Sequence, residues 1–346
     1  MWTGDQTGMT RPRFLPDNFT LLLIAMVILA SLLPIRGQAA INFNQFTNVA
    51  IAVLFFLHGA KLSREAVLAG LTHWRLHLVI FSATFIVFPL LGLALQPVFE
   101  PLLSPELYWG VLYICVLPST VQSSIAFTSI ARGNVPAALC SASASNLIGM
   151  FLTPMLVGLL ITSQANQQGV NQLDAIISIV SMLLLPFVLG QVFRAKVFPY
   201  IKRYPVLVKV VDQGSILLVV YAAFSEAVIE GIWHQVSLSV LAVLVGLCCL
   251  LLAIIMLLLT YGSRAMGFNK EDEITIVFCG SKKTLASGVP MAKILFAAHP
   301  IGMMVLPIML FHQIQLMVCG ILATHYAARL DKSSSIVLDM PDIEKP

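Results

Sequence analysis

Two adjacent lysines interrupt an otherwise apolar stretch in the second half of the chain. Lys282 and Lys283 follow the apolar residues 274–279 and precede the largely apolar residues 285–298. An ionisable residue at the centre of a membrane helix costs at least about 2.5–3.5 kcal/mol on insertion, so its presence there points to function. An ammonium group supplies a positive charge and three hydrogen-bond donors. A purely structural alternative is that both lysines cap the carbonyl end of the preceding half-helix, which carries negative partial charge.

A second polar interruption occurs at the matching place in the first half of the chain. It begins at Pro118 and continues with hydroxyl and amide side chains, whereas the other interruption begins at Gly280. Proline removes one backbone donor and frees a carbonyl one turn back, and Ser and Thr can satisfy such groups. Both patterns therefore predict helices that are broken inside the membrane. The predicted substrate- or ion-binding residues are Ser119, Thr120, Gln122, Ser123, Ser124, Asn146, Ser281, Lys282, Lys283 and Thr284.

Other polar residues lie on neighbouring apolar segments. Ser141 and Ser145 share one helical face, and small residues of this kind let membrane helices approach closely. We interpret them as packing residues, whereas Asn146 is assigned to the site. On the last apolar segment His312 and Gln315 belong to a polar patch, for which we expect structural hydrogen bonds rather than ligand binding.

The composition requires a membrane around these segments. Of the 346 residues, 58% are hydrophobic and 10% are charged, whereas soluble domains are about 45–50% apolar and 25% charged. A spanning helix needs about 20 mostly apolar residues. By that measure we predict an all-α membrane protein with ten helices, at residues 18–35, 43–60, 75–97, 107–132, 135–162, 173–194, 207–232, 236–261, 273–298 and 301–328. Residues 194–204 are predicted as the most basic loop, and the polar tail after Arg329 as disordered.

The loop charges predict the orientation of the chain. With an even number of helices both termini share one side, which holds sixteen Lys and Arg residues against only Arg36 on the other. Positively charged loops face the cytoplasm, so we predict a multi-pass protein of the plasma (inner) membrane with both termini cytoplasmic. Arg11 and Arg13 before an apolar run, with residues 37–40 after it, also fit a cleaved signal peptide. We expect this first helix to be retained, because the apolar run is long for a signal peptide.

The helices of the two halves recur at a constant offset of roughly 160 residues, and Pro118 and Ser281 are 163 positions apart. Each half contains five helices, an odd number, so the two copies must lie in opposite orientations. Inverted repeats with paired broken helices are typical of secondary transporters, whose site lies at the repeat interface. The predicted units are residues 1–163, residues 173–328 and a polar cytoplasmic tail at 329–346.

The residue pattern argues against several other classes of protein. It contains no Lys and Arg cluster with interleaved aromatic residues, so nucleic acid is not an expected partner. It also contains no HExxH, GxSxG or intramembrane Asp pair that would support an enzyme. The six cysteines lie in apolar runs without ligand-like spacing, so we expect free thiols, no metal site and no cofactor. Cys115 beside the first break gives arsenite efflux thin support as another transport activity.

Three stretches of the chain, including both helix breaks, resemble the bile acid:sodium symporter family. The similarity is to the branch of bacterial sodium-dependent transporters that are similar to the seventh mammalian member. The matching stretches are residues 55–63, residues 117–120 with 131–134, and residues 280–288. The resemblance implies two inverted five-helix repeats. It further implies a panel domain of helices one, two, six and seven and a core of helices three to five and eight to ten. Helices four and nine would be unwound and would cross at the centre of the core.

The chain departs from this family at the sodium sites. Sodium-coupled members carry an acidic residue at the break of helix nine, whereas residues 281–284 here contain two lysines and no acid. Sodium ligands in helix five would fall near Ala138 and Ala142, whose side chains cannot coordinate an ion. The resemblance therefore does not imply sodium coupling of the usual form, and it leaves sodium or proton coupling undecided.

We predict a secondary transporter of a small, anionic organic solute, embedded in the lipid bilayer. The half-helix after Thr284 points its positive N-terminus at the break, which favours an anion. The alternative is a membrane protein for regulation or ion homeostasis that does not transport. The sequence specifies neither the direction of transport nor the oligomeric state.

The two lysines are expected to have different roles. Consecutive helical residues point about 100° apart, so both are not expected in one site. We place the Lys283 ammonium in the vacated cation position, bonded to Ser119, Ser123 or Asn146. A lysine in such a place can also exchange a proton, which would allow proton coupling.

Overall fold

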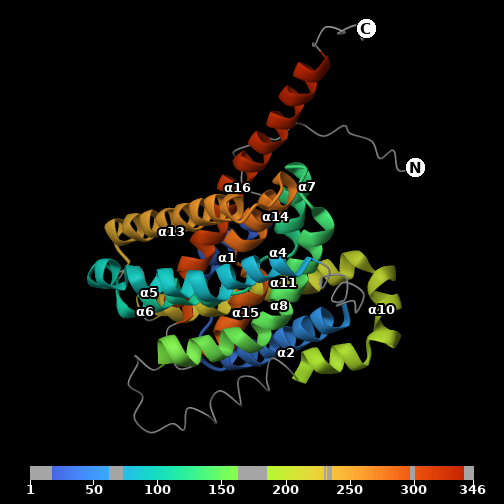
Figure 1. Cartoon of the computed structure of the whole chain (residues 1–346). Coiled ribbons are helices and arrows are strands. Elements are labelled where there is room, and N and C mark those ends of the chain that lie inside the picture. The colour runs from blue at the N-terminus through green and yellow to red at the C-terminus, as the bar shows by residue number, and fades with distance from the viewer. Residues whose placement is uncertain are drawn as a thin grey trace, which may run out of the picture.

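The computed structural model describes residues 18–61, 73–162, 185–229, 231, 236–296 and 301–338 (Figure 1). All regular structure in these ranges is helical, and they contain no strand. The first half contains α1 (Asn18–Leu32), α2 (Gly37–Lys61), α4 (Trp74–Ser82), η2 (Ala83–Val87), α5 (Phe88–Phe99), η3 (Glu100–Leu102), α6 (Pro105–Val116), α7 (Gln122–Ile130), α8 (Val135–Val157) and η4 (Gly158–Thr162). The second half contains α10 (Arg194–Arg203), α11 (Pro205–Ile229), α13 (Leu238–Ala265), α14 (Lys270–Ser281), α15 (Leu285–Leu295) and α16 (Ile301–Leu338), preceded by a helical stretch at 185–192.

Six helical segments of the described chain are long and apolar enough to cross a membrane. They are Gly37–Lys61, Trp74–Leu102, Val135–Ile161, Pro205–Ile229, Leu238–Ala265 and Ile301–Ala328. Large apolar side chains such as Leu159 and Leu257 are exposed on the outside of the bundle. Because helices satisfy their own backbone hydrogen bonds, such surfaces are stable in lipid. The chain is therefore a multi-pass membrane protein, as predicted.

Both predicted helix breaks are confirmed. α6 ends at Val116 and α7 begins at Gln122, while α14 ends at Ser281 and α15 begins at Leu285. The breaks also touch, because the Thr284 N–H donates a hydrogen bond of 3.0 Å to the carbonyl of Pro118. Irregular backbone at this depth therefore finds its partners in the other break rather than in lipid.

The third segment changes helical register halfway along. α4 passes into the π-helical turn η2, in which the Phe88 N–H bonds to the Ala83 carbonyl, five residues back. The next donor in this register would be Pro89, which has no N–H. The Thr84 carbonyl is therefore left for another partner. The helix predicted at 75–97 lies within the helical segment Trp74–Leu102, and Pro89 is the sequence signal of the π-helical turn in its middle.

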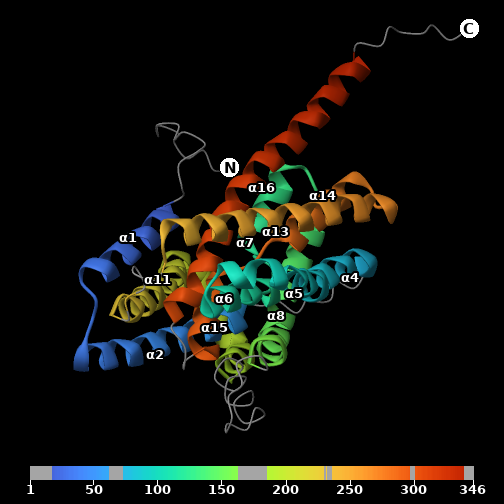
Figure 2. The same cartoon turned by 90° about the vertical axis from the view of Figure 1, so that its left-hand side faces the viewer.

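Two predicted non-helical regions are helical. The predicted loop at 194–204 is largely the helix α10. α16 continues past Arg329 to Leu338, so the prediction of a disordered tail is wrong for these residues. Figure 2 shows α16 passing through the bundle and projecting beyond it. Residues 173–184, the first part of the predicted sixth helix, lie outside the described residues.

Glycines bring the helices that carry the breaks close to their neighbours. A Cβ atom on Gly110 in α6 would come within 2.7 Å of the Met304 carbonyl oxygen in α16. A Cβ atom on Gly149 in α8 would come within 2.6 Å of the Pro118 ring. Small residues of this kind are the usual means of close helix packing in membranes. They place α8 and α16 directly against the breaks.

Gly190, in the helical stretch before α10, allows a test of close helix packing against α2. A Cβ atom there would overlap the carbonyl oxygen of Phe56 in α2, and a backbone atom cannot move aside cheaply. We expect Gly190→Ala to destabilise the protein by about 1–3 kcal/mol, the usual cost of overpacking. Thermal unfolding in detergent, followed by tryptophan fluorescence, measures it. Gly246→Ala in α13 is the matched control, because a Cβ there meets nothing within 4 Å. Equal midpoints for the two variants would contradict the described contact.

Candidate binding site at the two helix breaks

The ammonium of Lys283 lies in a cage of backbone carbonyl oxygens. It donates hydrogen bonds to the carbonyls of Thr84 at 2.8 Å, Cys115 at 3.0 Å and Leu117 at 2.8 Å. It also lies 4.0 Å from the centroid of the Phe88 ring, and the side chain is fully buried. All three N–H donors of the ammonium are therefore used. Two of the carbonyls belong to the end of α6, where the helix dipole is negative.

The partners predicted for Lys283 are wrong. The prediction named Ser119, Ser123 or Asn146, but none of them bonds to this ammonium in the described structure. The side chain instead reaches past the first break to the end of α6 and to η2. The Thr84 carbonyl in η2 is free because Pro89 has no N–H, so the residues of the breaks alone do not predict where the ammonium binds. The alternative that both lysines cap the preceding half-helix, α14, is also incomplete, because Lys283 caps the end of α6.

Gln315 in α16 holds the backbone of Lys283 in place. The Lys283 N–H donates to Gln315 Oε1 at 2.9 Å, and Gln315 Nε2 donates to the Lys283 carbonyl at 2.8 Å. The same Nε2 lies 2.9 Å from His312 Nδ1. Gln315 is fully buried, so one amide side chain satisfies both polar groups of an unwound peptide. The hydrogen bonds expected of this polar patch are therefore present.

Lys282 points to a different place, as the predicted angle between consecutive residues requires. Its ammonium donates to the carbonyl of Ser123 at 2.8 Å and lies 3.7 Å from the centroid of the Phe127 ring. The Phe278 ring is 5.5 Å away. Cation–π contacts stabilise a desolvated ammonium but use no donor in a fixed geometry. Among the described residues Lys282 therefore makes one hydrogen bond where Lys283 makes three.

Hydroxyl groups of the first break cap the end of α14. Ser119 Oγ donates to the Cys279 carbonyl at 2.6 Å, and Ser124 Oγ donates to the Phe278 carbonyl at 3.4 Å. Thr120 Oγ1 lies 2.6 Å from Ser123 Oγ and links these side chains into one cluster. Among the first-break residues, Ser119, Thr120, Ser123 and Ser124 are therefore brought together, as the sequence predicts. The C-terminal carbonyls of the two half-helices therefore have different partners. Those of α6 accept from the Lys283 ammonium, and those of α14 accept from serine hydroxyls.

α8 holds the first break from the other side. Asn146 Nδ2 donates to the Ser119 carbonyl at 2.6 Å, and the Ser119 N–H donates to Ser145 Oγ at 3.0 Å. Ser287 Oγ in α15 lies 3.4 Å from both Asn146 Oδ1 and Thr284 Oγ1. Asn146 therefore bridges the two breaks. Ser145, interpreted as a packing residue, has a second role as a hydrogen-bond acceptor.

The remaining predicted residues lie at the edge of this cluster. Ser281 is buried and donates to the Val277 carbonyl at 2.6 Å, within its own helix. Gln122 is exposed at the start of α7, so its predicted role in solute binding stays a prediction. Ala286, one residue into α15, is exposed as well. The N-cap residues of α7 and α15 make no side-chain cap hydrogen bond, so the first N–H groups of each half-helix lack the usual cap.

Asn134 has a role that its sequence motif did not reveal. Its side chain caps α8 by accepting from the Ala137 N–H at 3.1 Å, and its Nδ2 donates to Asp272 Oδ1 in α14 at 2.8 Å. Its backbone N–H donates to Thr275 Oγ1 at 3.0 Å. Asn134 thus ties together the starts of α8 and α14. The sequence signals the cap through an Asn directly before a helix, but it cannot identify the partner helix.

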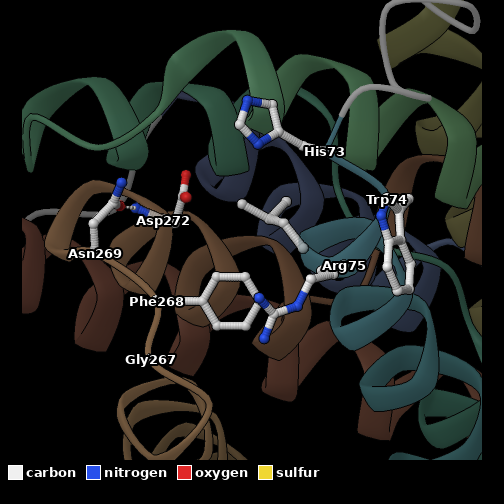
Figure 3. A pocket seen from close by; sticks show the side chains of 8 residues that line it. His73, Trp74, Arg75, Gly267, Phe268, Asn269 and Asp272 are labelled. Carbon is white, nitrogen blue, oxygen red and sulfur yellow. Dashed lines mark hydrogen bonds between the residues drawn. The ribbon is translucent and has the colours of Figure 1, made fainter.

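A cavity of about 320 Å³ lies away from the breaks, between the start of α4 and the turn from α13 to α14 (Figure 3). Arg75 lies over the Phe268 ring there, 5.5 Å from its centroid, and donates to the Met266 carbonyl at 3.2 Å. The lining residues are His73, Trp74, Arg75, Leu76, Gly267, Phe268, Asn269 and Asp272. None of the ten predicted binding residues is among them, so this cavity and the breaks are separate places.

Comparison with known proteins identifies relatives along the whole chain. It is 60% identical over 333 residues to the uncharacterized protein PA2026 of Pseudomonas aeruginosa, covering 96% of this chain and 99% of that protein. It is 54% identical over 318 residues to the Escherichia coli protein named "Putative symporter YfeH", covering 91% and 94% of the two chains. It is 25% identical over 292 residues to sodium/bile acid cotransporter 7 of Rattus norvegicus, covering 84% of each.

The family comparison covers almost all of the described structure. Residues 17–328 match the SBF-like CPA transporter family. This stretch includes both helix breaks, the lysine cage and Gln315. The resemblance noted from the sequence is confirmed: the chain belongs to the SBF-like CPA transporter family.

Proposed function

We propose that this secondary transporter moves a small organic anion and carries Lys283 as a built-in cation in place of a coupling sodium ion. Two inverted repeats, residues 1–163 and 173–328, would bring helices four and nine together as crossing broken helices in a core domain. Helices one, two, six and seven would form the panel beside it. Both termini would lie in the cytoplasm of a cell whose inner membrane holds the protein.

The observation that carries the proposal is the carbonyl cage around the Lys283 ammonium. Three carbonyl oxygens at 2.8–3.0 Å, drawn from two separate helical segments, are what a small cation would need at this place. Neither Lys282 nor Lys283 forms an ion pair with a carboxylate of the described chain. The Lys283 ammonium therefore lies against the end of α6 without an acidic partner among the described residues. In its charged form it favours an anion as the transported species.

The half-helix ends support an anionic solute independently. α7 and α15 both start beside the helix breaks without a side-chain cap, and helix N-termini attract anions. Lys282 has donors that no described residue uses, so it is the lysine we assign to the solute. Lys283, with all three donors engaged, is assigned to the cation position. The names of two relatives, a symporter and a sodium/bile acid cotransporter, support transport of an organic solute, whereas the replacement of sodium rests on the lysine cage.

Uptake into reconstituted vesicles tests the proposal. We expect labelled cholate, or a smaller carboxylate that competes with it, to enter the vesicles at equal rates in sodium and in choline buffer. Steep dependence on sodium would refute the built-in cation. No flux of any carboxylate would favour the alternative of a non-transporting regulatory protein.

Lys282→Gln should separate the two lysines in the same assay. We expect it to weaken apparent solute affinity by at least about tenfold, as loss of a charged hydrogen bond does. The matched control is Lys293→Gln, because Lys293 in α15 bonds to Asn44 in α2 at 3.0 Å and lies outside the breaks. If both variants retained wild-type affinity, Lys282 would not contact the solute.

A further inference from the structure

α10 carries one packed face and one unpartnered face at the edge of the bundle (Figure 1). Residues 194, 197, 198 and 201 are half-buried, at the spacing of a single helical face. α10 lies against α2 and α11, so this face is the one that packs. Lys196, Tyr200, Lys202 and Arg203 are exposed, and Tyr200 is 66% exposed. The outward side of α10 is therefore basic and aromatic at once.

Among the described residues, no ion pair balances the positive charge of this face. The sequence from 185 to 211 contains five basic residues and no acid. The next acid along the chain, Asp212, already pairs with Lys61 of α2. The Phe198 ring lies between Arg194, at 5.0 Å, and Lys202, at 4.9 Å, and this fixes part of the basic surface in place. The outward charges are left for a partner outside the described chain.

We propose that α10 lies on the bilayer surface and binds the headgroups of anionic phospholipids. Lys and Arg near an anionic membrane surface gain attraction, and Tyr prefers the boundary between headgroups and hydrocarbon. The chain continues from α10 into Tyr204, Val206 and Leu207, which are 49%, 74% and 60% exposed at the start of α11. Apolar residues that are this exposed directly after a basic helix fit a chain that enters lipid there. This inference does not depend on the transported solute.

Lipid titration of the purified full-length protein tests the proposal. Dioctanoyl phosphatidylglycerol is added in detergent, and the shift of the unfolding temperature gives its apparent affinity. Dioctanoyl phosphatidylcholine and inorganic phosphate are the parallel ligands, which separate a lipid headgroup from a neutral lipid and from a free anion. The test variant is Lys196→Gln with Lys202→Gln and Arg203→Gln. The matched control keeps the charge, as Lys196→Arg with Lys202→Arg and Arg203→Lys.

We expect wild type and the charge-preserving control to prefer phosphatidylglycerol at low salt. Each basic residue near an anionic surface contributes about fivefold in affinity, so the neutral variant should lose on the order of a hundredfold. Added salt should weaken the preference, because it screens exposed charges. The proposal is overturned if wild type binds both lipids equally, if the neutral variant keeps the preference, or if inorganic phosphate gives the same stabilisation as phosphatidylglycerol. Any of these results would assign the face to solvent or to free anions.

Discussion

Lys283→Met should lower the stability of the protein more than any other single lysine substitution. Methionine fills similar space but leaves the carbonyls of Thr84, Cys115 and Leu117 without their shared donor. Each buried acceptor left unpaired costs about 1–3 kcal/mol. Removing a buried charge also recovers its desolvation cost, but three acceptors and the negative end of α6 remain. We therefore expect a net loss of several kcal/mol, seen as a lower unfolding temperature in detergent.

A smaller side chain at the same position should make the protein respond to added cations. Lys283→Ala vacates the cage, and sodium or methylammonium can then occupy it and stabilise the folded state by mass action. Choline is too large and offers no N–H donor, so it should not. Wild type and the control Lys293→Ala should unfold at the same temperature in all three chloride salts. If Lys283→Ala also ignored the cation, or lost no stability at all, the built-in cation would be ruled out.

Gln315→Leu should have the second-largest effect. Leucine has a similar volume, but it leaves the backbone N–H and the carbonyl of Lys283 without their hydrogen-bond partner, and it removes a contact of His312. We expect a loss of about 2–5 kcal/mol from these buried groups, together with impaired transport in the vesicle assay. Gln315→Asn should be intermediate, because its shorter amide cannot reach both groups at once.

Thr324→Val is the control in the same helix. The Thr324 hydroxyl is exposed and donates to the Ile321 carbonyl of its own helix at 2.8 Å. We expect this substitution to cost clearly less than that of Gln315. Equal losses for the two variants would show that general polarity of α16, and not the amide pairing, stabilises the break.

The helix breaks could be predicted because polar residues stand out in apolar segments. Pro118 and the lysine pair gave both positions, and the contact between Thr284 and Pro118 confirms that they meet. The cage itself could not be predicted, since its ligands are backbone carbonyls that every residue possesses. Their availability depends on where α6 ends and on the register change before Pro89. Sequence patterns therefore located the lysines but not the carbonyl groups that accept their hydrogen bonds.

For α10 the sequence pattern predicted the wrong conformation. Its basic residues predicted a loop facing the cytoplasm. The structure accommodates Pro199 on the exposed side of α10, and a helix forms. The basic residues thus predicted a loop where the chain forms a helix.

The proposed cation, the Lys283 ammonium, is part of the protein and cannot dissociate, which has an electrical consequence for the proposed transport cycle. A bound sodium ion leaves with the solute, but a side chain returns with the empty carrier. The charge moved in each full cycle is then that of the solute alone. With a cell interior that is electrically negative, the outward passage of one negative charge is favoured by about 2.3 kcal/mol for every 100 mV. A carrier that holds its own cation would thus use the membrane voltage to expel a monovalent anion rather than to collect it.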